Sequence, residues 1–204
     1  MTKKWLRERR RDYYHRLAKE EGYRSRAAYK LLQTSAKHRL IRKGNVIVDL
    51  GAAPGGWMQV ARELVGVEGY VLGVDKELIE GFEWENVDSI VGDINFLDGS
   101  ELLRKLPRKA DVVLSDVSPN ISGVWEIDHA RQIGLAEASL RIAVTVLRRK
   151  GSFFVKVFQG DLLKDFVEKV KGCFRVVKLV KPKASRKRSS EMYVLALGLK
   201  GSDS

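Results

Sequence analysis

The stretch Asn45-Val-Ile-Val-Asp-Leu-Gly-Ala-Ala-Pro-Gly-Gly-Trp57 joins an apolar run to a glycine-rich turn, and helix-compatible sequence follows at residues 58–65. A buried strand, a tight turn and a helix start together form a cradle for a nucleotide-derived cofactor, because backbone amides at the helix N-terminus face the ligand. Glycines permit backbone conformations that other residues avoid. The stretch therefore predicts an α/β domain with a cofactor site at its first turn.

The spacing of this loop excludes two common phosphate-binding motifs. A P-loop requires Gly-x-x-x-x-Gly-Lys followed by Ser or Thr, and Trp57 and Met58 stand at the last two positions here. The dinucleotide motif Gly-x-Gly-x-x-Gly requires a glycine where this loop has Ala53, and Pro54 removes a backbone donor. We therefore expect an adenosine cofactor without phosphate groups.

Apolar runs and helix-compatible segments alternate along the chain. Strands are predicted at residues 45–50, 69–75, 87–91, 110–116, 151–158, 173–180 and 191–199, and helices at residues 27–33, 58–65, 100–106, 127–149 and 161–170. This order predicts a doubly wound, Rossmann-like α/β sheet that is mostly parallel, with one antiparallel strand at one end and helices on both faces. Ser25 is expected to cap the helix over residues 27–33, and Lys30 lies off its apolar stripe.

Length and composition predict a single domain. The chain has 204 residues, of which 44% are hydrophobic, enough for one α/β domain with a full core. We expect a basic N-terminal arm over residues 1–22, a catalytic domain over 23–200 and a tail over 201–204. The N-terminus is charged, and no apolar run approaches the roughly 18 residues of a membrane span, so we expect a cytoplasmic protein without a membrane partner. The single cysteine, Cys173, excludes an intramolecular disulfide.

The net charge of +12 is concentrated in two segments. Residues 1–43 contain 15 Lys or Arg against 4 Asp or Glu, and residues 178–188 contain 6 against none. The rest of the chain is mildly acidic. Two basic segments on an acidic body are typical of a nucleic-acid interface, although charge runs can also be solvated surface. Four aromatic residues interleave the first segment and could stack on bases: Trp5, Tyr13, Tyr14 and Tyr23.

Several charged residues stand at strand ends, where ligands of doubly wound sheets bind. Asp75 ends the second predicted strand and is expected to accept the ribose hydroxyls of the cofactor, and Asp93 after the third is expected to accept from its adenine amino group. Gly55 and Trp57 of the loop are candidates for lining the same pocket. The three histidines and Cys173 show no metal-ligand spacing, so no metal is expected.

Three further charged residues are candidates for chemistry. Asp116 ends the fourth predicted strand, and Glu191 begins the last. Lys156 interrupts the apolar strand Phe153-Phe-Val-Lys-Val-Phe158, and burying a lysine is costly unless it has partners.

The loop beginning at Asp49 resembles motif I of S-adenosyl-L-methionine-dependent methyltransferases, in the Asp-x-Gly-x-x-Pro-Gly-Gly form of the FtsJ/RrmJ family. The resemblance extends over about residues 23–199 and places the Lys-Asp-Lys-Glu constellation of that family on four residues: Lys30, Asp116, Lys156 and Glu191. It implies methyl transfer to a ribose 2′-hydroxyl of RNA, with a uridine of 23S ribosomal RNA in the large subunit as the family substrate. RNA would then contact residues 1–43 and 178–188.

A lysine base is compatible with this reaction. Free lysine has a pKa near 10.4, and two close, partly buried ammonium groups disfavour double protonation, so one lysine can become neutral. We expect Lys156 to be the base, oriented by Asp116, while Lys30 and Glu191 position the ribose; the sequence leaves open which lysine loses its proton. A tRNA 2′-O-methyltransferase, a cap methyltransferase and an inactive RNA-binding ribosome assembly factor remain alternatives, and loop spacing disfavours a nicotinamide oxidoreductase.

Overall fold

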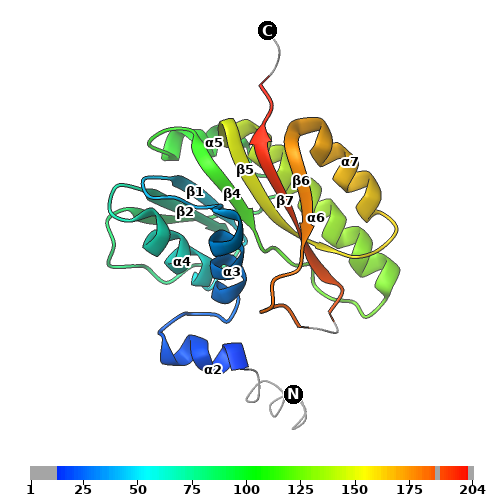
Figure 1. Cartoon of the computed structure of the whole chain (residues 1–204), viewed down its shortest axis with the longest axis horizontal. Helices are drawn as coiled ribbons and strands as arrows, with labels where there is room; N and C mark the ends of the chain where they lie inside the picture. Colours follow the sequence, from blue (N-terminus) through cyan, green and yellow to red (C-terminus); the bar gives the residue numbers. More distant parts are fainter. Residues whose placement is uncertain (1–12, 187–188, 202–204) are drawn as a thin grey trace.

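A computed structural model describes residues 13–186 and 189–201 of the chain. Seven strands form one sheet in the order β3-β2-β1-β4-β5-β7-β6 (Figure 1). The strands span β1 Val46–Leu50, β2 Tyr70–Asp75, β3 Val87–Val91, β4 Ala110–Ser115, β5 Leu147–Phe158, β6 Phe174–Val180 and β7 Glu191–Leu199. The helices are α2 Tyr13–Glu20, α3 Ala28–His38, α4 Gly56–Val65, α5 Gly99–Lys105, α6 Trp125–Val146 and α7 Leu163–Cys173. The alternating order confirms the doubly wound α/β fold.

The helices cover both faces of the sheet and divide the core in two. Residues of α5, α6 and α7 pack with Val46, Val48 and Leu50 of β1 on one face. Residues of α3 and α4 pack with Ile47 on the other face. Because side chains alternate along a strand, Asp49 points to the α3/α4 face with Ile47. All five residues of β1 are buried, as expected for a central parallel strand.

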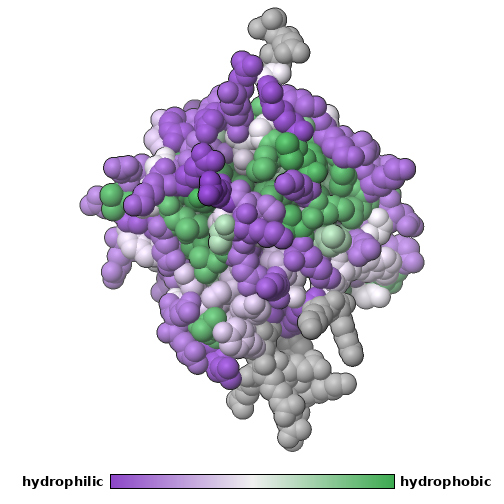
Figure 2. Space-filling view, in the orientation of Figure 1, coloured by the Kyte–Doolittle hydropathy of each residue, from purple (hydrophilic) through white to green (hydrophobic). Residues whose placement is uncertain are grey.

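The antiparallel strand is not at the end of the sheet. β7 pairs antiparallel with both β5 and β6, so it lies second from the edge and β6 forms the edge. Figure 2 shows apolar side chains gathered over β6 and β7, where Val176 and Leu179 of the edge strand are exposed. Inserting β7 beside β5 brings its first residue, Glu191, opposite Phe158 at the carboxyl end of β5.

Two predictions about helix ends were wrong. Ser25 does not cap α3: the N-cap is Ala27, in a helical conformation without a side-chain cap, because a turn at residues 25–28 already leads into the helix. α6 was expected to continue to Arg149, but it ends at Val146. Leu147 leaves the helix to pair with Ala110 of β4, and this pairing begins β5 four residues before the predicted strand.

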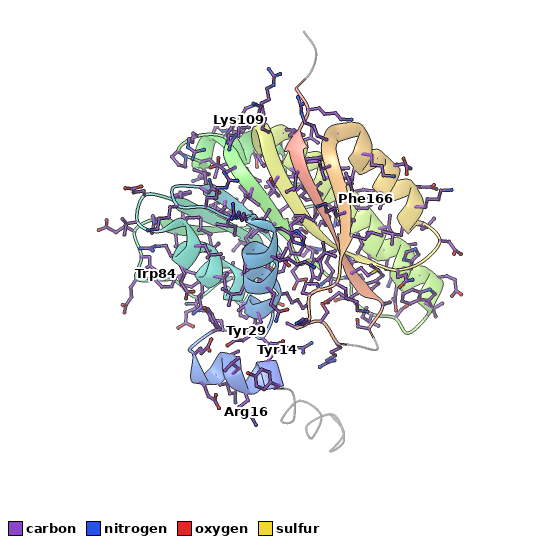
Figure 3. The ribbon with its side chains drawn as sticks, viewed as in Figure 1. Tyr14, Arg16, Tyr29, Trp84, Lys109 and Phe166 are labelled. Carbon is purple, nitrogen blue, oxygen red and sulfur yellow. The ribbon has the colours of Figure 1, made fainter. Side chains whose placement is uncertain are left out.

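Part of the expected basic arm packs on the domain. Residues 1–12 of the arm lie outside the described residues, as do 187–188 and 202–204. Ala18 of α2 is buried, and the rings of Tyr14 and Tyr23 contact Tyr29 of α3 at 5.3 and 5.7 Å between centroids (Figure 3). Two of the aromatic residues expected to stack on bases, Tyr14 and Tyr23, therefore pack against Tyr29 and are half-buried, whereas Tyr13 is exposed.

Candidate active site

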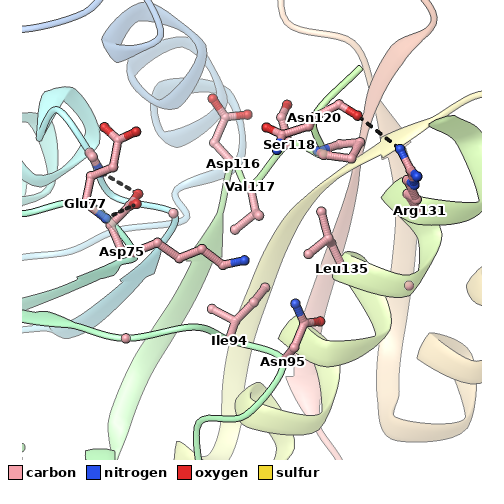
Figure 4. A pocket seen from close by; sticks show the side chains of 16 residues that line it. Asp75, Glu77, Ile94, Asn95, Asp116, Val117, Ser118, Asn120, Arg131 and Leu135 are labelled. Atoms are coloured by element: carbon pink, nitrogen blue, oxygen red, sulfur yellow. Dashed lines mark hydrogen bonds between the residues drawn. The ribbon is translucent and has the colours of Figure 1, made fainter. Parts of the chain in front are cut away.

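A cavity of about 810 Å³ opens at the carboxyl ends of β1 to β4, as expected for a parallel sheet (Figure 4). Its wall is built from the loops that follow these strands and from the side of α6. The lining residues include Gly51, Ala53, Asp75, Gly92, Ile94, Asn95, Asp116, Val117, Asn120, Arg131 and Leu135.

The glycine loop forms one wall of this cavity because its backbone approaches β4. Gly51 has φ +74°, and a Cβ atom there would lie 2.5 Å from Cγ2 of Val117. Its amide donates to the carbonyl oxygen of Val74 at 2.8 Å, which holds the turn against β2. Only a glycine satisfies both the conformation and this close approach.

Asp75 faces the cavity at the end of β2, as predicted. One carboxylate oxygen accepts from the amide of Ala53 at 2.9 Å and the other from the amide of Glu77 at 3.0 Å (Figure 4). These bonds tie the end of β2 to the glycine loop. Each oxygen keeps a further lone pair for a ligand hydroxyl.

Asp93, expected at the adenine amino group, is not among the residues that line the cavity. It accepts from the amide and side chain of Asn95 at 2.9 Å each and pairs with Lys76 at 2.9 Å. The hydrogen bonds donated by the backbone amide of Asn95 and by the side chain of Lys76 lower the pKa of Asp93. Its neighbours Ile94 and Asn95 line the cavity instead.

The four residues of the expected constellation meet at one end of the sheet, on the α3/α4 face. Nζ of Lys30 lies 2.8 Å from both carboxylate oxygens of Glu191 and 3.8 Å from Asp116. Nζ of Lys156 lies 3.3 Å from Oδ1 of Asp116 and donates to the Asp116 backbone oxygen at 2.6 Å and to the Ser118 hydroxyl. Asp116 joins this cluster to the cavity, because it also lines the cavity wall.

Both lysines are buried, with 6% of Lys30 and 5% of Lys156 exposed. Burial alone would raise the pKa of Asp116, but the charges of Lys156 and Lys30, with hydrogen bonds from Tyr193 and Lys156, bring it below its ordinary value. Asp116 is therefore an anion at neutral pH and compensates the lysine charges. Lys30 was expected off the apolar stripe, and it is buried because it faces β7 rather than solvent.

Comparison with known proteins agrees with this geometry. The FtsJ-like methyltransferase family matches residues 23–199. This chain belongs to the FtsJ-like methyltransferases. It is 49% identical over 198 residues to the ribosomal RNA large subunit methyltransferase E of Methanocaldococcus jannaschii, covering 95% of this chain and 81% of that protein. It is 54% identical over 186 residues to the protein of that name from Methanothrix thermoacetophila, covering 91% and 71%.

A solved structure shows the same fold. A ribosomal RNA methyltransferase from Plasmodium falciparum superposes with a TM-score of 0.76 and 28% identity, covering 88% of this chain and all of that one. Aeropyrum pernix fibrillarin, solved with S-adenosyl-L-methionine, shares the fold with a TM-score of 0.56 at 19% identity. The sheet of this FtsJ-like methyltransferase is thus the Rossmann-like methyltransferase sheet predicted from its strand order.

Besides Asp93, two residues proposed for the cofactor pocket of this FtsJ-like methyltransferase lie outside the cavity lining. Trp57 is 3% exposed, donates from Nε1 to the carbonyl oxygen of Ala27 at 2.7 Å and stacks on Phe154. The Trp57 ring points into the α3/α4 core, because this second residue of α4 lies on the helix face that packs against the sheet. Gly55 has φ +108° and lies against Phe82 and Arg24 rather than the cavity.

Tyr193 joins the constellation and was missed in the sequence. Its hydroxyl donates to Asp116 at 2.7 Å and accepts from Lys30 at 2.9 Å, and its ring stacks on Phe154 at 4.7 Å. Burial, together with the charges of Asp116 and Glu191, raises its pKa well above the ordinary value, so the hydroxyl stays protonated. Two-residue alternation from Glu191 on β7 was the signal that could have found it.

Asp49 of the glycine motif was also not assigned a place in the site. It is 1% exposed, and neither carboxylate oxygen has a hydrogen-bond partner among the described residues. Burial, and then the charges of Asp116 and Asp75, raise its pKa well above the ordinary value.

The described residues hold no cluster of three or more potential metal ligands. Within the same ranges, none of the helices combines the length and hydropathy that a bilayer crossing requires.

Proposed function

We propose that this FtsJ-like methyltransferase uses S-adenosyl-L-methionine to methylate a ribose 2′-hydroxyl of large-subunit ribosomal RNA, in the cytoplasm. The observation that carries the proposal is the buried Lys156, held by Asp116 at the edge of the cofactor-sized cavity. Family membership and the names of the relatives from Methanocaldococcus and Methanothrix support the RNA class.

The cavity residues fit the cofactor. S-adenosyl-L-methionine supplies an electrophilic methyl group on a positively charged sulfur. Asp75 would accept hydrogen bonds from the ribose hydroxyls of the cofactor, and the backbone near Asn95 and Asp93 would contact the adenine. Gly51, which has no side chain, would leave room for the cofactor beside the loop. Asp116, an anion at the cavity wall, would attract the positive sulfur.

The cluster beside the cavity would perform the proton transfer. The 2′-oxygen of the RNA ribose forms a bond to the methyl carbon as the carbon–sulfur bond breaks, and the hydroxyl proton passes to Nζ of Lys156 in its neutral form. Asp116 orients Lys156 through two oxygens, and Glu191 and Tyr193 hold Lys30 where it can donate to the ribose. RNA is the acceptor because DNA lacks the 2′-hydroxyl.

The test is incubation of the protein with methyl-labelled S-adenosyl-L-methionine and ribosomal subunits, total ribosomal RNA or tRNA, followed by mapping of the labelled ribose. Lys156→Ala is expected to abolish methyl transfer and leave cofactor affinity near that of the wild type, because the lysine lies outside the cavity lining. Lys169→Ala is the matched control, since this lysine on α7 is exposed and its ammonium group pairs with Glu137.

The outcomes separate the alternatives. Label in a ribose of large-subunit RNA supports the proposal, and near-normal turnover of Lys156→Ala contradicts the assignment of the base. Label in tRNA identifies a tRNA methyltransferase. RNA binding without label identifies an assembly factor, and label on a base contradicts 2′-O-methylation.

A further inference from the structure

Exposed apolar side chains gather where the loop after β4 enters α6. Trp125, the first residue of α6, is 44% exposed, and its neighbours on the loop and on the β5–α7 connection are exposed as well. We call the following residues the Trp125 patch: Ile121, Val124, Trp125, Ile127 and Leu162. Large apolar groups that remain exposed together mark interaction sites more often than scattered single ones.

The patch is held rigidly. Asp128 accepts from the amide and hydroxyl of Ser122 at 2.8 Å each and from the amide of Gly123 at 3.1 Å, which closes the loop onto the first turn of α6. The Trp125 ring stacks on the buried imidazole of His129 at 5.7 Å, and that imidazole accepts from the amide of Leu162 at 3.1 Å. A fixed aromatic ring loses little entropy when a ligand packs on it.

The patch is also tied to the catalytic cluster. Gln132 of α6 donates to the carbonyl oxygens of Val117 at 3.1 Å and Lys156 at 3.0 Å, so α6 is bonded to the strand that carries the proposed base. The Trp125 ring lies 6.0 Å from the ring of Phe158, which pairs with Glu191 across β5 and β7. The aromatic platform and the cluster therefore share one rim of the sheet.

A basic loop borders this rim. The amide of Gln159, next to Phe158, donates to the carbonyl oxygen of Ser190 at 2.9 Å, so the end of the loop between β6 and β7 lies beside the carboxyl end of β5. Lys183 and Arg186 of that loop are exposed. Aromatic and apolar surface on the same rim as exposed cations matches single-stranded RNA, whose bases stack while its phosphates pair with lysine and arginine.

We propose that the Trp125 patch binds a nucleobase of single-stranded RNA next to the nucleotide whose ribose is methylated. The inference rests on the proposed function for the location of that ribose. Trp125 contacts the base, and the basic loop contacts the phosphates. Because every base has an aromatic face, the contact positions the strand without selecting its sequence.

The experiment measures binding of fluorescein-labelled oligouridylate of about 12 nucleotides, and of the same strand with abasic riboses at alternate positions. Trp125→Ala is expected to weaken oligouridylate binding about tenfold, and Trp125→Phe to retain most of the affinity, because a phenyl ring can still stack on a base. Abasic substitution should weaken binding to the wild type more than to Trp125→Ala. Trp84→Ala, a half-buried tryptophan ahead of β3, is the matched control and should leave affinity unchanged.

Equal binding of both strands by the wild type, or unchanged affinity in Trp125→Ala, would overturn the proposal. A dimer in sedimentation that disappears in Trp125→Ala would assign the patch to a second copy of the chain and would also overturn it. Circular dichroism verifies folding of each variant. Because these readouts need no methyl transfer, a failure of the proposed function appears separately, as absence of label in RNA with the wild type.

Discussion

Lys30 and Lys156 are buried in the protein core, Lys30 beside the carboxylate of Glu191 and Lys156 beside that of Asp116. Desolvation of an ammonium group costs several kcal/mol unless opposite charges and hydrogen bonds offset it. Asp116 contacts both lysines, and Tyr193 bonds Asp116 and Lys30 with one hydroxyl. The cluster is thus a connected network in which each lysine is held by more than one group.

Gly51→Ala should damage both stability and the cofactor site. Gly51 has φ +74°, and a methyl group there would overlap Val117, which lines the cavity. Gly44→Ala is a matched control, because Gly44 also has φ +74° but no atom within 4 Å of an added Cβ. We expect a loss of about 1 kcal/mol in the control and of about 3 kcal/mol in Gly51→Ala.

Urea denaturation and calorimetric titration with S-adenosyl-L-methionine measure these effects. Cofactor affinity should fall at least tenfold in Gly51→Ala and stay unchanged in Gly44→Ala. Equal behaviour of the two variants would show that the close approach of Gly51 to Val117 is unimportant.

At the scale of elements, Asp111 holds three segments together at the amino edge of the sheet. Its buried carboxylate accepts from the amide of Val46 in β1 at 2.7 Å, pairs with Arg108 at 2.7 Å and bonds Arg148 of β5. Burial alone would raise the pKa of Asp111, but the hydrogen bonds from Arg108, Arg148 and Val46 outweigh it and lower the pKa. Arg148 reaches this position because β5 begins at Leu147.

Asp111→Asn should therefore remove an acid-sensitive part of the stability. A carboxyl whose pKa is lower in the folded state than in the unfolded state stabilises the protein at pH values above the unfolded pKa, near 3.9. This contribution is lost as the pH falls through the pKa of the folded state. We expect the variant to be about 2 kcal/mol less stable at pH 7. The loss is smaller than for a fully buried ion pair, because water screens the two half-exposed arginines. Urea denaturation at pH 7, 5 and 3 should show the difference from wild type narrowing below pH 4; a constant difference would contradict this origin.

Helix α3 depends on contacts with the cofactor half of the domain for its position. Arg24, shortly before α3, donates to the carbonyl oxygens of Glu80 at 2.6 Å and Gly81 at 2.8 Å, and Ala27 accepts from Trp57 at 2.7 Å. These bonds connect the segment that leads to Lys30 with the glycine loop and the loop after β2. The position of a proposed catalytic lysine is thereby set from the cofactor side.

On the scale of the whole molecule, exposed cations lie both beside the catalytic cluster proposed above and at the opposite end of the sheet. The exposed cations Lys183 and Arg186 belong to the loop that contacts Glu191 through Ser185, whereas Lys105 ends α5 and Lys109 directly precedes β4, at the opposite end of the sheet (Figure 3 labels Lys109). Binding of RNA should therefore depend on salt through the first pair. Reversing charges beside the site removes phosphate contacts, and reversing them at the far edge changes the net charge alone.

The double variant Lys183→Glu, Arg186→Glu is expected to reduce the slope of log affinity for ribosomal RNA against log salt by about 1.5. Lys105→Glu, Lys109→Glu carries the same charge change and should leave the slope near that of the wild type. Filter binding between 50 and 300 mM salt measures both. Equal slopes for the two double variants would mean that net charge, rather than its position, governs RNA binding.

The loop from Asp49 to Trp57 could be interpreted from local sequence, because the conformation of a strand, a glycine turn and a helix start depends on neighbouring residues. Alternation of strands and helices predicted the sheet for the same reason. Local patterns were less reliable at element ends: Leu147 left its helix because β4 offered a pairing partner.

Tertiary structure determined which way the side chains of the site point and which of them contact one another. Trp57 belongs to the loop but points into the core, and Tyr193 sits at the centre of the cluster although only its spacing from Glu191 indicated a shared face. Resemblance to a family named Lys30 and Glu191, yet nothing local to either residue shows that their charged groups are 2.8 Å apart. That contact exists because β7 is inserted beside β5 and α3 packs across them, an arrangement set by burial of the whole sheet rather than by any one segment.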